Sequence, residues 1–400
     1  VAIVGVTTPW SMVWDKLHLQ GKLQIDDVVP SVRRAVKDAR AAGAQVVVVV
    51  SHAGLQAPGG PSNEMPGMEA ENPMAAVARE VPGIDAIILG HTHAEFADTT
   101  INGVLLVQPR NWATSVAVAT LTVERDGKAW RVAGKHGAIV RVAGHAERQD
   151  VLDGSAAAHA AARKYATATV GATSTEWRSD SARTRDTPVI DFIGEVMRRA
   201  SGADLASTAV FSTNIAIPKG TLTVAQIARL YPYDNTMRVV KMSGTTLKAF
   251  LERSAQYYRV TGSGADLRAA PDPAFIGFNF EVVSGASYDV DLSRPSGDRI
   301  VGLAVKGRPV APTDSFTIAL SNYRASGTGG YAMVADARVV KDDSREVRQL
   351  LIDEITRKKD LKATDYYAES WHLGPAPLAA QVQQAIAGQG YFEAVRRPPT

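Results

Sequence analysis

Two histidines that stand one residue apart offer the clearest chemistry in the sequence. His91 and His93 lie in residues 90–93, which read Gly-His-Thr-His and directly follow the apolar run of residues 84–89. Such a run predicts a buried strand, and α/β sheets bind ligands beyond the carboxyl ends of their strands. Imidazole nitrogen suits zinc, iron and similar metals. The pattern therefore predicts a metal site at the end of this strand.

A third histidine has the same kind of position. His52 follows the β-branched run of residues 45–50. Neighbouring parallel strands bring their carboxyl ends together, so we expect His52 to converge with His91 and His93. The alternative is that all three are loop histidines bonded to the backbone, and their shared position at strand ends favours convergence. The other five histidines lack that position: His18, His136, His145, His159 and His372.

The composition limits the classes of function. The 44 basic and 41 acidic residues nearly cancel, and no long basic block stands out, so binding of a nucleic-acid polymer has no support. The sequence has no cysteine, so any metal must be held by His, Asp, Glu or Asn. No apolar run approaches the roughly 20 residues of a membrane-spanning helix, and we expect no transmembrane segment.

The first 142 residues alternate between strand-like and helix-like patterns, which predicts a layered α/β domain. Strands are expected at residues 45–50, 84–89, 104–107 and 116–123, and helices from Pro30 to Gly43 and at residues 73–80. A chain of 400 residues is too long for one ordinary core, so two domains are expected. The Ala-rich helix expected over residues 146–168 would connect them.

The second half mixes helices and strands. Residues 187–200, 224–230, 245–258 and 346–358 have helical patterns, residues 237–242 and 317–320 have strand patterns, and residues 277–291 resemble paired strands. A glycine-rich loop follows residues 321–324, and residues from 366 onward form a less regular tail. The fold class is therefore α/β (α+β) with two domains.

Several motifs resemble the second half of a calcineurin-like metallophosphoesterase domain. They are Ser51-His52-Ala53-Gly54, Glu71-Asn72, and residues 82–93, which read Pro-Gly-Ile-Asp-Ala-Ile-Ile-Leu-Gly-His-Thr-His. They are most similar to the 5'-nucleotidase family. The resemblance implies two divalent metal ions (Zn, Mn, Fe, Co or Mg) that clamp a phosphate and activate a water. It implies His52 and His91 as ligands of one metal and His93 as a ligand of the other.

The family's remaining motifs are not found in this chain. They are Asp-X-His, Gly-Asp and Gly-Asn-His, of which the last supplies the histidine that acts as acid. The chain opens on the strand-like residues 1–6, so we expect a fragment whose amino-terminal part is missing. No catalytic acid is assigned, and the expectation is that this chain alone binds metal weakly and is inactive.

The second half carries two further family motifs. Tyr233 lies in Tyr-Pro-Tyr-Asp-Asn-Thr and Tyr323 in Asn-Tyr-Arg-Ala, and aromatic residues at these positions in the family sandwich the nucleobase. The alternative is core packing, which is a common fate of tyrosine. Flanking Pro, Asp and Asn at Tyr233, and glycines after Tyr323, favour exposed loops and hence stacking, which suits any base.

Two polar residues complete the expected substrate site. The resemblance implies that Arg183 reaches the phosphate or ribose, for which a guanidinium fork is suited; the alternative is a solvated charge at a helix start. Asn214 stands where the family often has Asn followed by glycines and an arginine, but the chain lacks those glycines and that arginine. Gly329 stands near the place of a family acid. Tyrosine at both stacking positions, the Tyr-Pro-Tyr-Asp-Asn run and Asn-Tyr-Arg-Ala most resemble the 2',3'-cyclic-nucleotide 2'-phosphodiesterase/3'-nucleotidase branch.

The resemblance implies a domain plan. Residues 1–143 would be a partial metallophosphoesterase domain, the carboxyl part of a layered sandwich, and residues 144–170 a linker helix. Residues 171–360 would be the mixed α/β domain that binds the nucleotide, and residues 361–400 a tail. Hinge rotation between the domains could carry substrate to the metals.

The expected function is metal-dependent hydrolysis of nucleotide phosphoesters. The resemblance implies a periplasmic location or an extracellular or cell-surface one, where most members of the family act. The expected partner is the nucleotide substrate, without a protein partner. The alternative is a nucleotide-binding protein without catalysis. A metallo-β-lactamase-like zinc hydrolase is disfavoured, because residues 94–96 do not continue its His-X-His-X-Asp-His motif.

Overall fold

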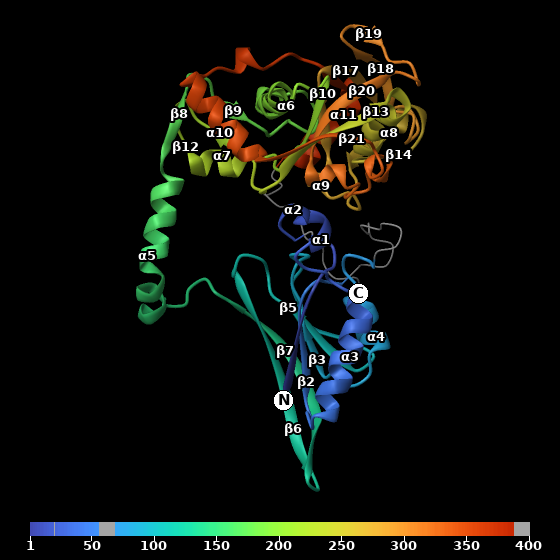
Figure 1. Cartoon of the computed structure of the whole chain (residues 1–400). Coiled ribbons are helices and arrows are strands. Elements are labelled where there is room, and N and C mark those ends of the chain that lie inside the picture. Colours follow the sequence, from blue (N-terminus) through green and yellow to red (C-terminus); the bar gives the residue numbers. More distant parts are fainter. Residues whose placement is uncertain (20, 56–68, 388–400) are drawn as a thin grey trace. The chain divides into compact units, whose positions relative to one another are not determined.

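The computed structural model describes residues 1–19, 21–55 and 69–387. The chain divides into two compact units, the first comprising residues 1–148 and the second beginning at Gln149 (Figure 1). Among the described residues, no helix has the length and apolar character needed to cross a membrane.

The first unit is built on a five-stranded sheet in the order β1-β2-β3-β5-β4. The strands are β1 (Ala2–Thr7), β2 (Val47–His52), β3 (Ala86–Ile88), β5 (Val104–Gln108) and β4 (Phe96–Ile101). The first four run parallel, and β4 pairs antiparallel with β5. The carboxyl ends of β1, β2 and β3 therefore lie at one edge.

One face of this sheet is covered by helices α3 (Val28–Ala41) and α4 (Met74–Glu80). Val32 and Val36 of α3 and Val77 of α4 are buried against Val47 and Val49 of β2. The helical spacing of Val28, Val32 and Val36 places all three on the face that meets the sheet. Two short helices, α1 (Ser11–Trp14) and α2 (Lys16–Leu19), follow β1.

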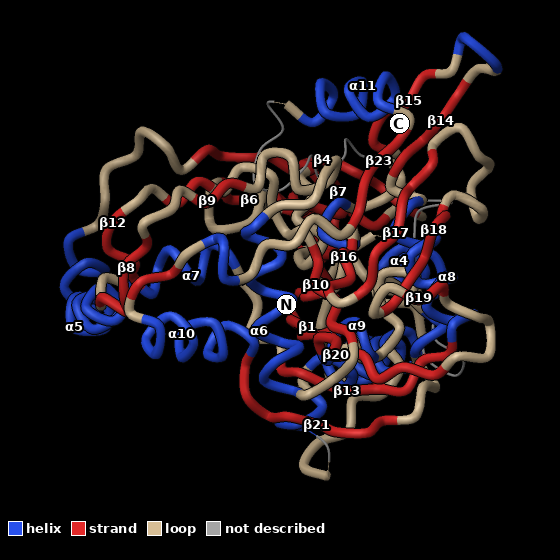
Figure 2. Tube along the Cα trace, turned by 90° about the horizontal axis from the view of Figure 1, so that it is seen from above, coloured by secondary structure: helices blue, strands red, loops and turns tan. Residues whose placement is uncertain are grey.

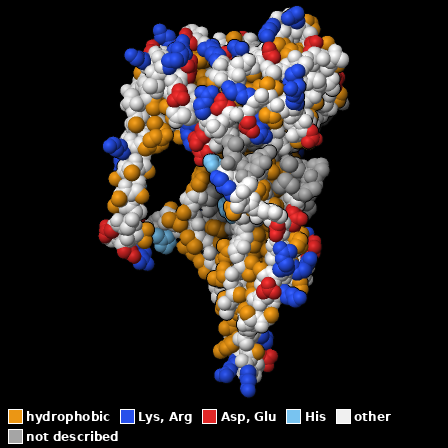
Figure 3. All heavy atoms as spheres, in the orientation of Figure 1, with side chains coloured by type: hydrophobic (Ala, Val, Ile, Leu, Met, Phe, Trp, Pro, Cys, Tyr) orange, Lys and Arg blue, Asp and Glu red, His pale blue; other side chains and the backbone are white. Residues whose placement is uncertain are grey.

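The other face is partly covered by the antiparallel hairpin of β6 (Ser115–Asp126) and β7 (Ala129–Arg141). Ala117, Ala119 and Leu121 pack there against Leu105 and Val107. Hydrophobic side chains remain exposed over this hairpin (Figure 3). The exposed apolar residues of the sheet and hairpin are Val1, Ile3, Val50, Val116, Val118, Val123, Trp130 and Val140, with Val142 just after β7.

Helix α5 (Gln149–Ala166) opens the second unit. None of its residues is buried, and Val151 and Tyr165 are each 61% exposed. Alanine has the highest helix propensity, which explains why this stretch is helical without a packed face. The helix expected over residues 146–168 thus has nearly the expected bounds.

The second unit is organised around a sheet in the order β16-β10-β20-β13-β21. The strands are β16 (Glu281–Ser284), β10 (Leu205–Ala209), β20 (Ser315–Ser321), β13 (Thr236–Ser243) and β21 (Val339–Glu346). β10 and β20 are parallel, whereas β16 is antiparallel to β10, and β13 is antiparallel to both β20 and β21.

Helices α6 (Pro188–Ser201), α7 (Val224–Leu230), α8 (Gly244–Ala255) and α10 (Val347–Lys358) supply much of the core of this unit. Helices α7 and α10 pack on the small sheet of β12 (Gly220–Thr223), β8 (Thr169–Thr173) and β22 (Asp360–Leu361). Figure 2 shows both helices near β8 and β12. The four-stranded sheet is β19 (Arg308–Pro309), β18 (Ile300–Val305), β17 (Ala286–Asp291) and β23 (Trp371–Gly374).

The remaining elements are short. They are β9 (Trp177–Arg178) with β11 (Ala216–Ile217), β14 (Tyr258–Thr261) with β15 (Arg268–Pro271), α9 (Asn322–Ala325), α11 (Ala376–Ile386) and the 3-10 turns Gly264–Asp266, Gly277–Asn279, Ala332–Val334 and Ala363–Asp365.

The expected α/β class is confirmed. Helices expected at residues 187–200, 245–258 and 346–358 are present as α6, α8 and α10. In the segment expected as a tail, residues 361–387 contribute β23 and α11 to the second unit, with Trp371 and Val382 buried in its core. Residues 388–400 of that tail lie outside the described part of the chain.

Candidate functional site

His52 and His91 come together at the carboxyl edge of the first sheet. His52 is the last residue of β2, and His91 lies three residues after the end of β3. Their rings meet edge to face with centroids 5.3 Å apart. β2 and β3 are adjacent and parallel, which is why residues far apart in the sequence meet here. The predicted convergence therefore holds for these two imidazoles.

Gly90 lets the histidine loop approach His52. A Cβ added at Gly90 would lie 3.3 Å from Nδ1 of His52, closer than most real Cβ contacts. Both His91 (φ 70°) and His93 (φ 56°) adopt the left-handed backbone region, which is uncommon for residues other than glycine. Such backbone conformations gather at functional sites, where the surroundings must hold them.

Glu71 and Trp14 surround His91. Nε2 of His91 lies 2.5 Å from Oε1 of Glu71. The Trp14 ring lies 5.3 Å from the His91 ring, centroid to centroid. Asn72, the residue after Glu71, accepts a hydrogen bond from the Gly54 amide at 2.8 Å. The motif residues of the three segments thus gather around one imidazole.

His93 lies beside Trp112, with ring centroids 6.1 Å apart. Burial lowers the pKa of both His52 and His93, and the neighbouring His91 lowers each further. A lowered pKa favours the neutral imidazole, which is the form that binds a metal.

The donor atoms of these side chains are of the kinds that bind a divalent metal, but their number is incomplete. Imidazole nitrogen and carboxylate oxygen both bind zinc or iron. Among the residues that the structure describes, however, no group of three or more His, Asp or Glu side chains is arranged to hold a metal ion. The described residues thus supply donors of a suitable kind without forming a complete ligand set.

In the second unit, the predicted stacking residues share one edge of the central sheet. Tyr233 lies three residues before β13, and Tyr323 lies two residues after the end of β20. β13 and β20 are antiparallel, with Met237 opposite Ser321, so the start of one strand adjoins the end of the other. Tyr233 is 37% exposed and Tyr323 is half-buried.

Phe211 is a third aromatic residue at this edge, and it belongs to none of the motifs found in the sequence. It lies two residues after the end of β10, which is parallel to β20. Its ring contacts Tyr233 edge to face at 5.1 Å and the buried Tyr231 at 5.0 Å. The feature that could have predicted its location is its position directly after β10, because β10 pairs with β20, the strand that precedes Tyr323.

Asn214 and Arg183 have contrasting environments. Asn214 is exposed in the loop that follows Phe211, where its Oδ1 accepts a hydrogen bond from Ser212 at 2.6 Å. Arg183 is only 3% exposed, and its guanidinium donates to the Val210 carbonyl at 3.0 Å. These contacts give Arg183 a packing role between segments, and its contact with a phosphate or ribose stays a prediction.

Comparison with known proteins identifies the second unit. The family model of the 5'-nucleotidase C-terminal domain matches residues 164–336. Residues 164–336 are a 5'-nucleotidase C-terminal domain. This match spans Arg183, Asn214, Tyr233 and Tyr323, and it confirms the family relation that the motifs of the sequence indicated.

Two curated relatives extend the similarity to both units. The chain is 28% identical to a 2',3'-cyclic-nucleotide 2'-phosphodiesterase/3'-nucleotidase of Salmonella typhimurium, over 94% of this chain and 66% of that protein. It is 29% identical to the trifunctional nucleotide phosphoesterase protein YfkN of Bacillus subtilis, over 94% of this chain and 28% of that protein. The chain therefore spans less than two thirds of either relative.

A solved structure shows the same fold. A putative 5'-nucleotidase from Staphylococcus aureus superposes with a TM-score of 0.75 at 23% identity, over 93% of this chain and 72% of that one. The layered α/β unit followed by the 5'-nucleotidase C-terminal domain is thus an arrangement that other proteins share.

Proposed function

We propose that this chain binds a nucleotide through its 5'-nucleotidase C-terminal domain and belongs to a protein that hydrolyses the nucleotide's phosphoester. One observation carries the proposal. Tyr233 and Tyr323, the two aromatic residues expected to hold the base, lie at the same edge of the sheet in the domain that matches the family model. Two aromatic faces on one edge suit a planar base, because stacking on each contributes on the order of 1 to 3 kcal/mol.

The phosphoester chemistry would be located in the first unit. His52 and His91 would hold one divalent metal ion and His93 would hold a second, both from the group Zn, Mn, Fe, Co and Mg. Such ions clamp a phosphate and activate a water when bound. Glu71 orients His91 through Nε2 and fixes the ring that faces His52. Because the described ligand set is incomplete, we propose that the isolated chain binds metal weakly and does not turn over substrate.

The proposed substrates are 2',3'-cyclic nucleotides and 3'-nucleotides, with 5'-nucleotides as the alternative within the same class. Tyrosine at both stacking positions supports the cyclic-nucleotide branch, as does the name of the Salmonella relative. The proposed location, which is periplasmic or else extracellular or at the cell surface, rests on the family resemblance alone. A nucleic-acid polymer and a protein partner are not part of the proposal.

A nucleotide-binding protein without catalysis is the second candidate. It is favoured by the incomplete metal ligand set of the described residues. The two candidates agree about the second unit and differ only about hydrolysis.

Phosphate release separates these candidates. The chain of residues 1–400, and a longer protein that contains it with the Asp-X-His, Gly-Asp and Gly-Asn-His motifs, would be assayed with 2',3'-cyclic AMP, 3'-AMP and 5'-AMP in Mn²⁺ or Zn²⁺. We expect hydrolysis of at least one nucleotide by the longer protein and none by residues 1–400. Failure of the longer protein on all three substrates would leave only the binding function, and robust hydrolysis by residues 1–400 would contradict the incomplete site.

A further inference from the structure

The guanidinium of Arg324 lies against two tyrosine rings. Its central carbon is 4.0 Å from the centroid of the Tyr331 ring and 5.4 Å from that of the Tyr323 ring. Arg324 is the residue directly after Tyr323 and is only 1% exposed. A cation at this distance from an aromatic face is attracted to it, and the attraction increases when water is excluded. The predicted base-stacking ring therefore has a buried cation as its neighbour.

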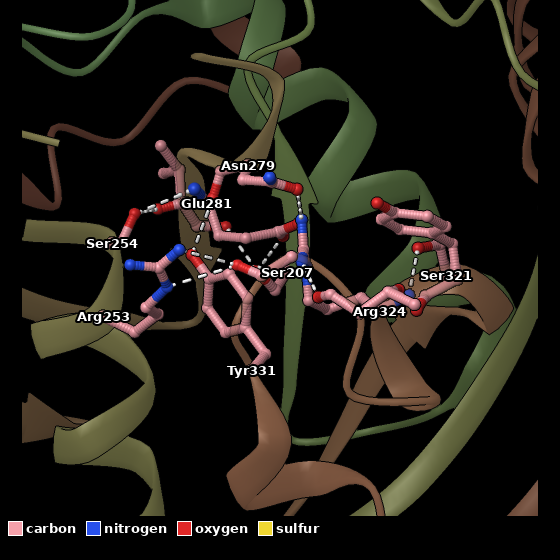
Figure 4. A network of polar contacts seen from close by, with 12 residues as sticks. Ser207, Arg253, Ser254, Asn279, Glu281, Ser321, Arg324 and Tyr331 are labelled. Atoms are coloured by element: carbon pink, nitrogen blue, oxygen red, sulfur yellow. Dashed lines mark hydrogen bonds and ion pairs between the residues drawn. The ribbon is translucent and has the colours of Figure 1, made fainter. Parts of the chain in front are cut away.

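Every guanidinium nitrogen of Arg324 is held (Figure 4). Nε donates to Oε1 of Glu281 at 2.7 Å, Nη2 donates to Oδ1 of Asn279 at 3.1 Å, and Nη1 donates to the Thr328 carbonyl. The other carboxylate oxygen of Glu281 accepts from Ser207 at 2.6 Å. The planar guanidinium of arginine can donate to all three acceptors in this arrangement. The ammonium group of lysine cannot reproduce that geometry. The position of the cation is thus fixed from three directions.

The backbone around Tyr323 is fixed as well. The Tyr323 carbonyl accepts hydrogen bonds from Ser326 Oγ at 2.7 Å and from Thr328 Oγ1. The Arg324 amide donates to Ser321 Oγ at 3.1 Å, which caps helix α9. These hydrogen bonds hold the loop that follows β20 against the backbone of Tyr323.

The glycine-rich loop permits this packing. A Cβ at Gly329 would lie 2.2 Å from Asn279 Oδ1 and 2.5 Å from Arg324 Nη1, so a side chain there would displace the fork. Gly329 also has a left-handed φ of 72°. The loop thus needs glycine in order to place the Thr328 carbonyl against Arg324.

A buried ion pair is weak evidence for stability, because removing both charges from water costs free energy that the pair only partly recovers. Arg324 and Glu281 have side-chain exposures of 2% and 3%, so neither is placed to contact a ligand directly. What the pair does provide is a rigid neighbour for Tyr323. A ring that is already oriented loses less conformational entropy when it binds a base.

We propose that Arg324 is a positioning residue: fixed by Glu281, it holds the Tyr323 ring in the orientation that stacks on a nucleobase. This proposal rests on the proposed function, in which Tyr323 contacts the base. Arg324 acts through Tyr323 and does not touch the ligand.

The test compares the affinity of the 1–400 chain for AMP and for ribose 5-phosphate, which lacks the base, by titration calorimetry. The ratio of the two Kd values reports the contribution of the base. The variants are Arg324→Lys, which keeps the charge and loses the fork, and Thr328→Val, which removes the hydroxyl that binds the Tyr323 carbonyl. Tyr323→Ala is the reference. Arg299→Lys is the matched control, since Arg299 is also buried and donates to the carbonyls of Ala255 and Tyr258, but it is not among the contacts of Tyr323.

We expect Arg324→Lys to lower the AMP preference over ribose 5-phosphate by roughly three- to tenfold and Thr328→Val by about twofold or more. Arg299→Lys should lower the melting temperature and leave the preference unchanged. If Tyr323→Ala lowers the preference but Arg324→Lys and Thr328→Val do not, the positioning role is overturned and the proposed function stands. If Tyr323→Ala has no effect, both the base contact of Tyr323 and the role of Arg324 are overturned. If Arg324→Lys does not fold, Asn279→Ala, which removes the side-chain acceptor of Arg324 Nη2, decides between the same outcomes.

Discussion

The rings of His52 and His91 meet edge to face at the carboxyl edge of the first sheet, with their centroids 5.3 Å apart. This contact joins the end of β2 to the loop after β3, and Gly90 allows the close approach. It brings two potential metal ligands together through the parallel pairing of adjacent strands.

Zinc binding should depend on this pair. We expect the 1–400 chain, purified without a histidine tag, to bind Zn²⁺ weakly, and His52→Ala or His91→Ala to weaken that binding by roughly tenfold or more. His159→Ala is the matched control, because His159 lies on the exposed helix α5. Calorimetric titration measures the affinities. Equal zinc affinity in the His91→Ala and His159→Ala variants would remove the pair as a metal site.

Gly137 should be essential to the packing of the first unit. A Cβ at Gly137 would lie 1.6 Å from the Ala97 carbonyl oxygen, and relieving this overlap requires the backbone to move. We expect Gly137→Ala to lower the free energy of unfolding by about 1 to 3 kcal/mol. Gly134, in the same strand, provides the control, since its added Cβ would meet nothing closer than Thr122 at 3.5 Å. Denaturant titration of both variants should show a loss only for Gly137→Ala, and similar losses would show that strand propensity matters more than the overlap.

Asp191 and Asp186 form a buried pair of carboxyl groups beside the start of α6. Asp186 accepts from the Ser370 amide at 2.7 Å and hydroxyl at 2.8 Å, and Asp191 accepts from the Ala368 amide at 3.1 Å. Burial raises the pKa of Asp191 to about 8, and the charge of Asp186 adds to the rise. Asp191 therefore keeps its proton at neutral pH and can share it with Asp186.

This raised pKa predicts how stability depends on pH. The unfolded Asp191 ionises near its ordinary pKa of 3.8, whereas the folded group resists ionisation until the pH reaches about 8. The protonated form therefore stabilises the fold fully below pH 3.8, and this contribution is lost as the pH rises to about 8. Asp191→Asn mimics the protonated form. Relative to the parent chain, this variant should gain roughly 1 to 3 kcal/mol of unfolding free energy between about pH 5 and about pH 8.5.

Urea titrations of the second unit at those two pH values measure this gain. Asp353→Asn, at an exposed position of α10, should show no such gain. An Asp191→Asn variant that differs from the parent by the same amount at both pH values would show that Asp191 ionises normally in the fold.

The sequence predicted those features that depend on local pattern. The β-branched runs before His52 and His91 did become neighbouring parallel strands, and the family motifs around Tyr233 and Tyr323 did fall in the matched domain. Each of these features depends on a short stretch of sequence in which a polar loop follows an apolar run.

The long-range contacts could not be predicted in the same way. Phe211 reaches Tyr233 only because β10 lies next to β20, and β20 next to β13, in a strand order that does not follow the sequence. The Glu281 and Arg324 pair joins residues 43 positions apart, and its burial depends on the glycine-rich loop closing over it. Arg183 had two interpretations at the sequence level, and its 3% exposure came only from tertiary packing.

Equilibrium binding of AMP to the 1–400 chain and to its Tyr233→Ala and Tyr323→Ala variants measures whether these two tyrosines hold a nucleobase. We expect saturable binding by the parent chain and an affinity about tenfold lower in each variant, because each variant loses one stacking face. Absence of AMP binding by the folded parent chain, or equal affinity in all three proteins, would contradict this role of the two tyrosines.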